Sequence, residues 1–505
     1  MTGSVVLDGH SLTVEDVVAV ARDAAEVRVS PDAAARASRS RAAIERAAAG
    51  SAPVYGVNTG FGKLASVRIP PDRLLELQRN LILSHCAGVG PPLPRPIVRA
   101  IMLLRANVLL QETSGARPVL AERLTQLLNA GIHPIVPEQG SVGASGDLAP
   151  LSHIARALLG DGDVEIAALD AEAGRRVSAG AALAEARLEP VVLQAKEGLS
   201  FINGTQAQSA MLALLLHDAR NLWRSAHGAA AMSLEALRGT PVPFDARIHD
   251  ARPHAGQKSS AALMRALLEN SEIRESHRTN DPRVQDAYSL RCVPQVLGTV
   301  SEGLDFAERI LAVELNAATD NPLVFGGELL SGGNFHGQPV ALALDVLATV
   351  LTTLAGIAER RIEALVNPDL SQGLPAFLTP QAGLQSGYMM VQVTAAALVA
   401  ECRTLCAPAS VQSIPTDANQ EDYVPMGMAA AMKARRVLAN AQRVVAAELL
   451  CGAQGLEFLK PLEPGRGVAD VYRKVRHLVN ALEADRPITD DIERLAALLE
   501  REAIV

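Results

Sequence analysis

The chain has 505 residues, of which 49% are apolar and 20% charged, and its net charge is −8. This length is enough for a large buried core and for two or three structural units. The negative charge and an aromatic content of only 3% count against a nucleic-acid-binding protein. The small charged fraction is compatible with a protein that covers part of its surface by forming an oligomer.

The first residues, MTGSVVLDGHSLTVEDVV, lack the basic segment and apolar run of a signal peptide. The longest apolar stretch begins at Pro339 and carries Asp345 and several threonines, so it predicts a core helix and not a membrane span. The five cysteines are scattered without the pairing of a metal site: Cys86, Cys292, Cys402, Cys406 and Cys451. We therefore expect reduced thiols, a cytoplasmic protein and no bound metal.

The N-terminal part is predicted to alternate short helices with loops. A short strand and a turn at Asp8-Gly9 precede a helix capped by Thr13, and Ser30-Pro31 opens a second helix. After these, the pattern predicts a loop, two helices, an irregular zone and a small hairpin, at residues 51–68, 71–87, 95–112, 131–148 and 160–182.

After about residue 200 the chain is rich in Ala and Leu and predicts long helices, at 204–238, 298–318, 339–366, 383–406 and 428–451. Several of these exceed the usual helix length, and such helices bury their faces by packing side by side. We therefore predict a mainly α protein with a long-helix bundle as its core and minor β-hairpins. The predicted domains are a loop-rich helical domain, 1–199, and a bundle domain that forms the oligomer core, 200–505.

Residues 140–150 read GSVGASGDLAP. The spacing Gly-x-x-Gly-x-x-Gly matches neither a Rossmann fingerprint nor a P-loop, and the stretch lacks the Gly-x-Ser-x-Gly elbow of serine hydrolases. Local pattern alone favours a tight loop before a helix that begins at Ala149-Pro150.

The triplet Ala144-Ser145-Gly146, followed by DLAPLSH, resembles the signature of the aromatic amino acid ammonia-lyases. In that family the triplet cyclises without a helper enzyme to methylidene-imidazolone (MIO), a built-in electrophile. The nitrogen of Gly146 attacks the carbonyl carbon of Ala144, Ser145 loses its hydroxyl, and two waters leave. The close approach suits a residue that has no Cβ. The resemblance implies no external cofactor.

Two further segments carry the resemblance. YGVNTGFGKL supplies Tyr55, which the resemblance makes the base that removes the substrate's β-proton; its pKa is near 10 when free, so the site is expected to stabilise the phenolate. LQRNLILSHCAGVG supplies Ser84-His85, and His85 is placed in the side-chain pocket. Taken alone, each has a structural alternative: a core tyrosine and a structural histidine.

The remaining implied site residues lie farther along the chain: Asn203 beside the substrate amine, Gln285 and Tyr288 around the MIO, Arg291 on the substrate carboxylate, Phe335 in the MIO pocket, and Glu421. A guanidinium suits a carboxylate because it binds it with two parallel donors. The structural alternatives are an N-cap role for Asn203 and a partly solvated helix face for Gln285 and Tyr288.

His85 together with Glu421 is the pattern of the histidine-specific members of the family. The resemblance therefore implies elimination of ammonia from L-histidine to give trans-urocanate. Differences near the site, such as Ala287, Tyr423 and Pro425, leave the substrate range open, so a tyrosine or phenylalanine ammonia-lyase or an aminomutase stays an alternative. A non-catalytic helical assembly is the alternative from another class. The resemblance also implies a homotetramer whose active sites are shared between subunits.

Overall fold

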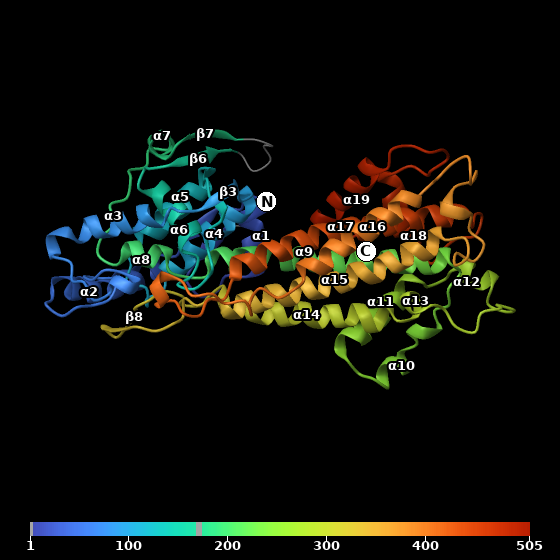
Figure 1. Ribbon diagram of the computed structural model, residues 1–505, viewed down its shortest axis with the longest axis horizontal. Helices are drawn as coiled ribbons and strands as arrows, with labels where there is room; N and C mark the ends of the chain where they lie inside the picture. The colour runs from blue at the N-terminus through green and yellow to red at the C-terminus, as the bar shows by residue number, and fades with distance from the viewer. Residues whose placement is uncertain (1–3, 168–173) are drawn as a thin grey trace. The chain divides into compact units, whose positions relative to one another are not determined.

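The computed structural model describes residues 4–167 and 174–505. Helices dominate it, and the strands are short and few, so the predicted mainly α class is confirmed (Figure 1). By their contacts, the residues form two compact units. The first comprises 1–214, 308–345 and 408–432, and the second 215–307, 346–407 and 433–505. Both units are discontinuous in sequence, whereas the predicted division had one boundary, between 199 and 200.

The first two helices begin where their capping residues predicted. Helix α1 (Val14–Arg22) has a capping box, in which Thr13 accepts from the backbone of Asp16 and the Asp16 side chain accepts from Thr13 in return. Helix α2 (Pro31–Ala49) is capped by Ser30 and has proline in its first turn. Strands β1 (Val5–Leu7) and β2 (Val27–Val29) pair in parallel beside these helices.

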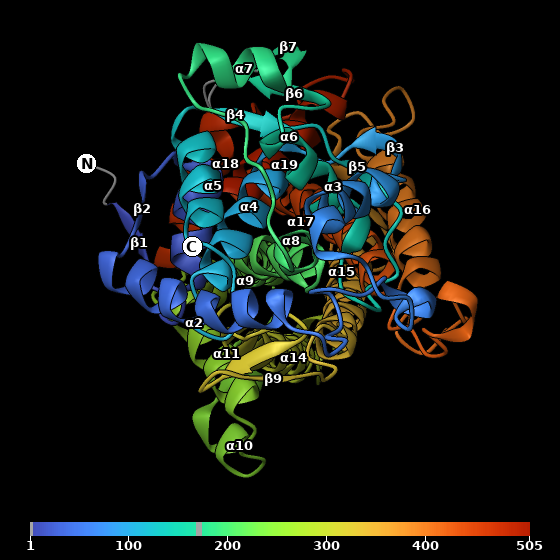
Figure 2. The same cartoon turned by 90° about the vertical axis from the view of Figure 1, so that its left-hand side faces the viewer.

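The remaining helices of the first unit are α3 (Leu74–His85), α4 (Arg95–Leu109), α5 (Val119–Asn129), α6 (Leu148–Leu158), α7 (Ala179–Glu185) and α8 (Glu197–Ile202). Helix α4 is buried along its whole length except its first residues and packs against α1 and α5. Figure 2 shows α4 beside α5. Because its residues are buried on every side, it forms the centre of this unit.

The predicted irregular zone at 131–148 is wrong in part, because it contains two short strands. Strand β4 (Ile132–Pro134) pairs with β6 (Asp163–Ile166), and β5 (Pro137–Gln139) pairs with β3 (Val89–Pro92). The prolines in these strands weakened the strand signal in the sequence. The predicted hairpin exists as β6 paired with β7 (Arg175–Ser178), while its turn, at 168–173, lies outside the described residues.

All five predicted long helices are present, with shifted ends: α9 (Gln206–Ala236), α14 (Val293–Glu314), α15 (Gln338–Val366), α16 (Met389–Leu405) and α17 (Gly427–Glu457). Among the described residues, α15 alone is long and apolar enough to cross a membrane. Of its most apolar window, 56% is buried within the structure. A single buried helix of this kind is what a protein core also contains, in agreement with the predicted core helix.

The second unit also contains shorter helices: α10 (Ala246–Asp250), α11 (Ala255–Leu267), α12 (Glu272–Ser276), α13 (Tyr288–Arg291), α18 (Arg466–Leu478) and α19 (Thr489–Arg501). Helix α18 packs against α11 and α19 and buries Val468, Val471 and Val475, which recur every three or four residues on one face. The hairpin β8 (Leu323–Phe325) and β9 (Glu328–Leu330) belongs to the first unit.

Candidate active site

The Ala-Ser-Gly triplet is seated against the turn that joins α8 to α9. Gly146 and Gly204 form a bridge between parallel backbones, and the amide of Asp147 donates to the Gly204 carbonyl at 2.7 Å. Gly146 has a φ of +82°, and a Cβ there would lie 2.2 Å from the Gly204 nitrogen. Glycine is therefore required at 146 both by backbone conformation and by the space that Gly204 leaves.

Asn203 lies at the end of α8 and not at the start of α9, so the N-cap alternative is wrong. Its backbone caps the C-terminus of α8, and its side-chain amide donates to the Ser145 carbonyl at 2.7 Å. The Oδ1 atom of Asn203 is buried and has no hydrogen-bond partner. A buried acceptor without a partner is costly, so this atom is suited to a donor that arrives with a ligand.

Three glycines lie against the side chain of Gln208, and one of them, Gly143, belongs to the loop that carries the triplet. A Cβ at Gly143, Gly337 or Gly427 would lie 2.9, 2.3 or 1.9 Å from a Gln208 amide atom. The loop backbone is also bonded to the segments before α15 and α17, since the amide of Gly337 donates to the Gly143 carbonyl at 3.1 Å and that of Met426 donates to Val142 at 2.8 Å.

Four helices, α6, α9, α15 and α17, thus begin at or beside the triplet. Helix N-termini carry partial positive charge, so negative charge that develops at the triplet is stabilised. Asp147 is the fully buried acidic residue of this region. Burial raises its pKa to about 6, although hydrogen bonds from the Gln208 amide and the Ser141 hydroxyl, both at 2.9 Å, oppose the shift.

Tyr55 lies in a loop anchored by the buried side chain of Val57. The amide of Gly62 donates to its hydroxyl oxygen at 3.3 Å, and its ring meets Phe61 edge-on. Burial raises the pKa of Tyr55, and the charges of two nearby carboxylates raise it further, while the Gly62 amide alone opposes. The expected stabilisation of the phenolate is therefore not met by this environment, because desolvation and two negative charges both disfavour it.

The two carboxylates belong to Asp417 and Glu421, on one tight turn. Thr416 and Glu421 close the turn as a backbone pair, and the Thr416 hydroxyl donates to Glu421 at 2.6 Å. Asp417 accepts from the Lys63 amide at 3.1 Å, which ties the turn to the loop of Tyr55. Sequence reasoning missed Asp417. Its only signal was a second acidic residue four positions before Glu421.

His85 ends α3 with one ring nitrogen occupied. Its Nδ1 lies 2.8 Å from the Leu81 carbonyl, so Nδ1 carries the proton and Nε2 is an acceptor in the neutral ring. Burial lowers the pKa of His85, and the charges of Glu421 and Asp417 oppose that shift. The structure thus brings together Tyr55, His85 and Glu421, which the sequence had placed in one site.

Phe335 is half-buried in the segment 331–337, two residues before the Gly337 contact with the loop. Next to it, His336 stacks on the ring of Tyr423 and lies 3.1 Å from the Tyr423 carbonyl. The segment is therefore held to both the loop and the turn of Glu421. The proposed contact of Phe335 with the reacting group stays a prediction.

Gln285, Tyr288 and Arg291 lie in the second unit. The Arg291 guanidinium carbon lies 4.6 Å from the centre of the Tyr288 ring, and Tyr288 is 71% exposed. Gln285 and Arg291 line a cavity of about 640 Å³ that also contains Arg274, Arg278 and Arg283. In this lining Arg283 is paired with Asp281 and Asp286, and Arg278 with Glu275. Arg291 keeps a buried donor, its Nε, without a partner, and a guanidinium of this kind favours an anionic ligand group such as a carboxylate.

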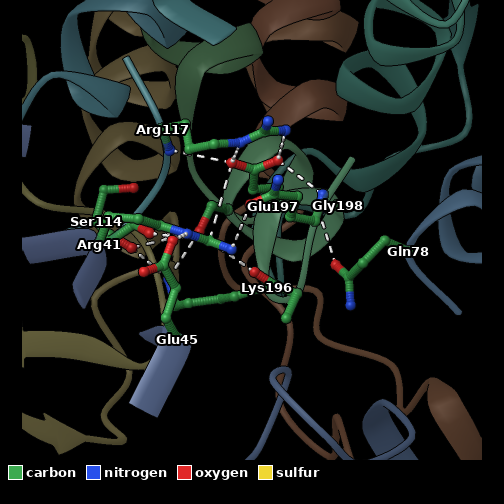
Figure 3. Close-up of polar contacts among 12 residues, drawn as sticks. Arg41, Glu45, Gln78, Ser114, Arg117, Lys196, Glu197 and Gly198 are labelled. Atoms are coloured by element: carbon green, nitrogen blue, oxygen red, sulfur yellow. Dashed lines mark hydrogen bonds and ion pairs between the residues drawn. The ribbon is translucent and has the colours of Figure 1, made fainter. Parts of the chain in front are cut away.

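A buried ionic cluster holds the start of α8, six residues before Asn203 (Figure 3). Lys196 is fully buried in a left-handed conformation, with φ +69°. Its ammonium group donates to Asp320 at 2.6 Å, to the Ser200 hydroxyl at 2.7 Å and to the Ser114 carbonyl at 2.8 Å. These contacts use all three of its donors, so the strained residue is held in one position.

Glu197, the next residue, is also fully buried and accepts from Arg117 through two bonds of 2.7 Å and from the Gln194 amide at 2.8 Å. Arg41 lies 3.9 Å away, and its outer side meets the exposed carboxylate of Glu45 at 3.5 Å. Glu197 is thus the buried anion between two guanidinium groups, as Figure 3 shows.

Glu197→Gln should lower the free energy of unfolding by about 3–5 kcal/mol, because it leaves two guanidinium groups without their buried anion. Denaturant unfolding at neutral pH measures the change. Glu45→Gln is the matched control on the same arginine, and its effect should stay within about 1 kcal/mol since Glu45 is exposed. Equal losses in the two variants would contradict the assignment of Glu197 as the centre of the cluster.

Polar groups from several segments surround Ser145, which lies between Ala144 and Gly146. A sequence profile of the aromatic amino acid lyase family matches residues 12–477, and the chain belongs to that family. The histidine ammonia-lyase of Myxococcus xanthus (strain DK1622) is 52% identical, over 98% of this chain and 96% of its own. That of Anaeromyxobacter sp. (strain K) is 53% identical, over 98% of each.

Two solved structures are similar over nearly the whole chain. The histidine ammonia-lyase from Trypanosoma cruzi has a TM-score of 0.91 at 44% identity and covers 99% of this chain and 94% of its own. The tyrosine aminomutase from Streptomyces globisporus has a TM-score of 0.92 at 42% identity, with coverages of 99% and 97%.

Proposed function

We propose that the protein is a carbon–nitrogen lyase that eliminates ammonia from L-histidine to give trans-urocanate. The observation that carries this proposal is the grouping of His85, Glu421 and Tyr55, in which the free Nε2 of His85 and the Glu421 carboxylate offer two acceptors to an imidazole N–H. Relatives named histidine ammonia-lyase at about half identity support it. A non-catalytic helical assembly would need none of these polar groups.

We propose further that Ala144-Ser145-Gly146 cyclises to MIO by attack of the Gly146 nitrogen on the Ala144 carbonyl carbon, with loss of two waters. The residues present fit that group, since Gly146 has no room for a Cβ and the Ser145 carbonyl is held by the Asn203 amide. The MIO supplies an electrophile that helps the substrate nitrogen to leave.

Side chains and helix N-termini of the protein would remove the β-proton, bind the amine and orient the imidazole. Tyr55 would take the β-proton as general base once it is ionised. The free Oδ1 of Asn203 would accept from the substrate amine. The N-termini of the four helices stabilise negative charge beside the triplet. His85 and Glu421 would orient the imidazole, which sets the β-carbon relative to the base.

The first test is the intact mass of the protein, which should be lower than that of the sequence by two waters. A second is incubation with L-histidine, L-tyrosine and L-phenylalanine while the ultraviolet absorbance of the conjugated product is followed. Conversion of L-histidine at the highest kcat/KM supports the proposal. A full-length unmodified mass would contradict it, and so would a clear preference for another amino acid.

Glu421→Gln should lower kcat/KM for L-histidine by about 10- to 100-fold, the effect of losing a charge-assisted hydrogen bond. Any residual rate on L-tyrosine or L-phenylalanine should change by less than about threefold. The control is Asp422→Asn, which removes the neighbouring exposed carboxylate. Parallel losses on all substrates would show that Glu421 does not set specificity.

The second candidate is a tyrosine aminomutase, because a protein of that name is 42% identical and has the same fold. The free Nε2 of His85 is also able to accept from a phenol hydroxyl. Accumulation of a β-amino acid from L-tyrosine, detected by chromatography, distinguishes this candidate from the lyase.

We propose a homotetramer, in which Arg291 and its neighbours complete the active site of another subunit and bind the substrate carboxylate. The exposed ring of Tyr288 supports a role for this segment in contacts with another subunit. Mixing an inactive Tyr55→Phe chain with an inactive Arg291→Met chain should restore part of the activity if sites are shared. A cytoplasmic location is proposed from the thiols, all five of which are free.

A further inference from the structure

Arg105 is a buried cation without an ion-pair partner of its own. The charge of Asp320 acts on it, but Asp320 is paired with Lys196. It lies in the middle of α4 and is fully buried, with 0% of its surface exposed. Its Nη1 donates to the Asn203 carbonyl at 2.9 Å and to the Gln206 side-chain oxygen at 2.8 Å. Its Nε and Nη2 are buried without a partner. Among the described residues, no carboxylate forms an ion pair with this guanidinium.

One acceptor of Arg105, the Asn203 carbonyl, lies in the turn between α8 and α9, and the other belongs to Gln206, the first residue of α9. A Cβ at Gly204 would lie 2.8 Å from the Arg105 Nη1 on one side of the turn. The other side of Gly204 faces Gly146, whose Cβ would lie 2.2 Å from the Gly204 nitrogen. Gly204 thus lies between the backbone of Gly146 and a polar group formed by Arg105, Gln206 and Thr319, which leaves no room for a side chain at 204.

A buried guanidinium in which two nitrogens have no acceptor lowers the stability of the fold. Packing alone therefore does not explain why an arginine occupies position 105. Burial also lowers the pKa of Arg105 to about 10. A polar group that is costly to the fold and touches the site is expected to serve the site.

We propose that Arg105 is a positioning residue that holds the turn 203–204 against Gly146, so that the triplet can cyclise and Asn203 stays on the Ser145 carbonyl. The proposal rests on the cyclisation proposed above. Arg105 touches neither substrate nor triplet and acts through Asn203 and Gly204. A planar guanidinium suits this task because its donors are fixed in one plane, whereas an ammonium group on a flexible stem is not.

The same helix provides a matched control. Arg99 is 3% exposed, and burial lowers its pKa to about 10 as well. It donates to the carbonyls of Val20 and Leu128 and contacts His133, none of which belongs to the site. Arg99 and Arg105 thus share residue type, helix and burial, and they differ in what their side chains hold.

The test compares Arg105→Met and Arg105→Lys with Arg99→Met and Arg99→Lys. The fraction of each protein that lacks two waters is measured by intact mass, circular dichroism reports the fold, and kcat is measured per cyclised chain with L-histidine. We expect the cyclised fraction of Arg105→Met to fall at least about tenfold below that of Arg99→Met, and kcat per cyclised chain to fall as well. Arg105→Lys should recover part of both.

A cyclised fraction and kcat in Arg105→Met equal to those of Arg99→Met would overturn the proposal. If Arg105→Met does not fold, the cyclised fraction and kcat of Arg105→Lys are compared with those of Arg99→Lys, and equal values would overturn the proposal. The mass of the unsubstituted protein distinguishes failure of the proposed function from failure of the role proposed for Arg105. An unmodified mass there refutes the proposed function and this inference together, whereas a cyclised parent with equally cyclised arginine variants refutes the inference only.

Discussion

Ser145→Ala should yield a folded protein whose mass is no longer short by two waters and whose ammonia-lyase activity falls by a factor on the order of 10³ or more, as when a covalent catalytic group is removed. The hydroxyl of Ser145 is the group that must leave, as the second water, to form the exocyclic methylidene. The loop itself should persist, because its contacts with Asn203, Gly337 and Met426 use backbone atoms. Intact mass and kcat with L-histidine measure the two effects.

Ser152→Ala is the control for that variant. Ser152 follows in α6, is fully buried, and its hydroxyl has no partner, so its removal should leave both the mass loss and the activity unchanged within about twofold. Activity that survives in Ser145→Ala at more than a tenth of the parent value would refute the role of the triplet.

Tyr55→Phe should lower kcat by about 10²- to 10⁴-fold, the range over which a general base acts. Cyclisation should be unaffected, so the mass stays short by two waters. In the unsubstituted protein kcat/KM should rise with pH, because only the ionised phenol can take the proton and its pKa is raised by burial and by the carboxylates of Asp417 and Glu421. That rise should disappear in Tyr55→Phe.

Tyr423→Phe tests whether the effect belongs to this hydroxyl. Tyr423 lies near the same turn, and phenylalanine keeps both the carbonyl and the stacked ring that contact His336. We expect a change in kcat below about threefold. A pH profile of Tyr55→Phe that still rises as in the parent would assign the base to another group.

Much of the fold could be predicted locally. Thr13 and Ser30 predict the starts of two helices because their side chains accept hydrogen bonds from backbone amides only three residues later. The long Ala- and Leu-rich helices were found for the same reason, since their pattern is contained in the helix itself. The strands β3, β4 and β5 were missed because partners that lie far along the chain stabilise them against a proline-rich composition.

For the site, the sequence by itself determined which chemical groups are present: a serine between residues that allow ring closure, a phenol, an imidazole, two amides, guanidinium groups and a carboxylate. Only the tertiary structure decided how they are used. Asn203 meets Ser145 across 58 positions, and Arg105 meets Asn203 across 98. Contacts over such separations leave no periodic trace in one sequence, because they depend on how whole helices pack. The role of Gly146 shows the division. The sequence alone indicates that Gly146 can adopt a positive φ. Only the tertiary structure shows that the backbone of Gly204 leaves no space for a side chain at this position.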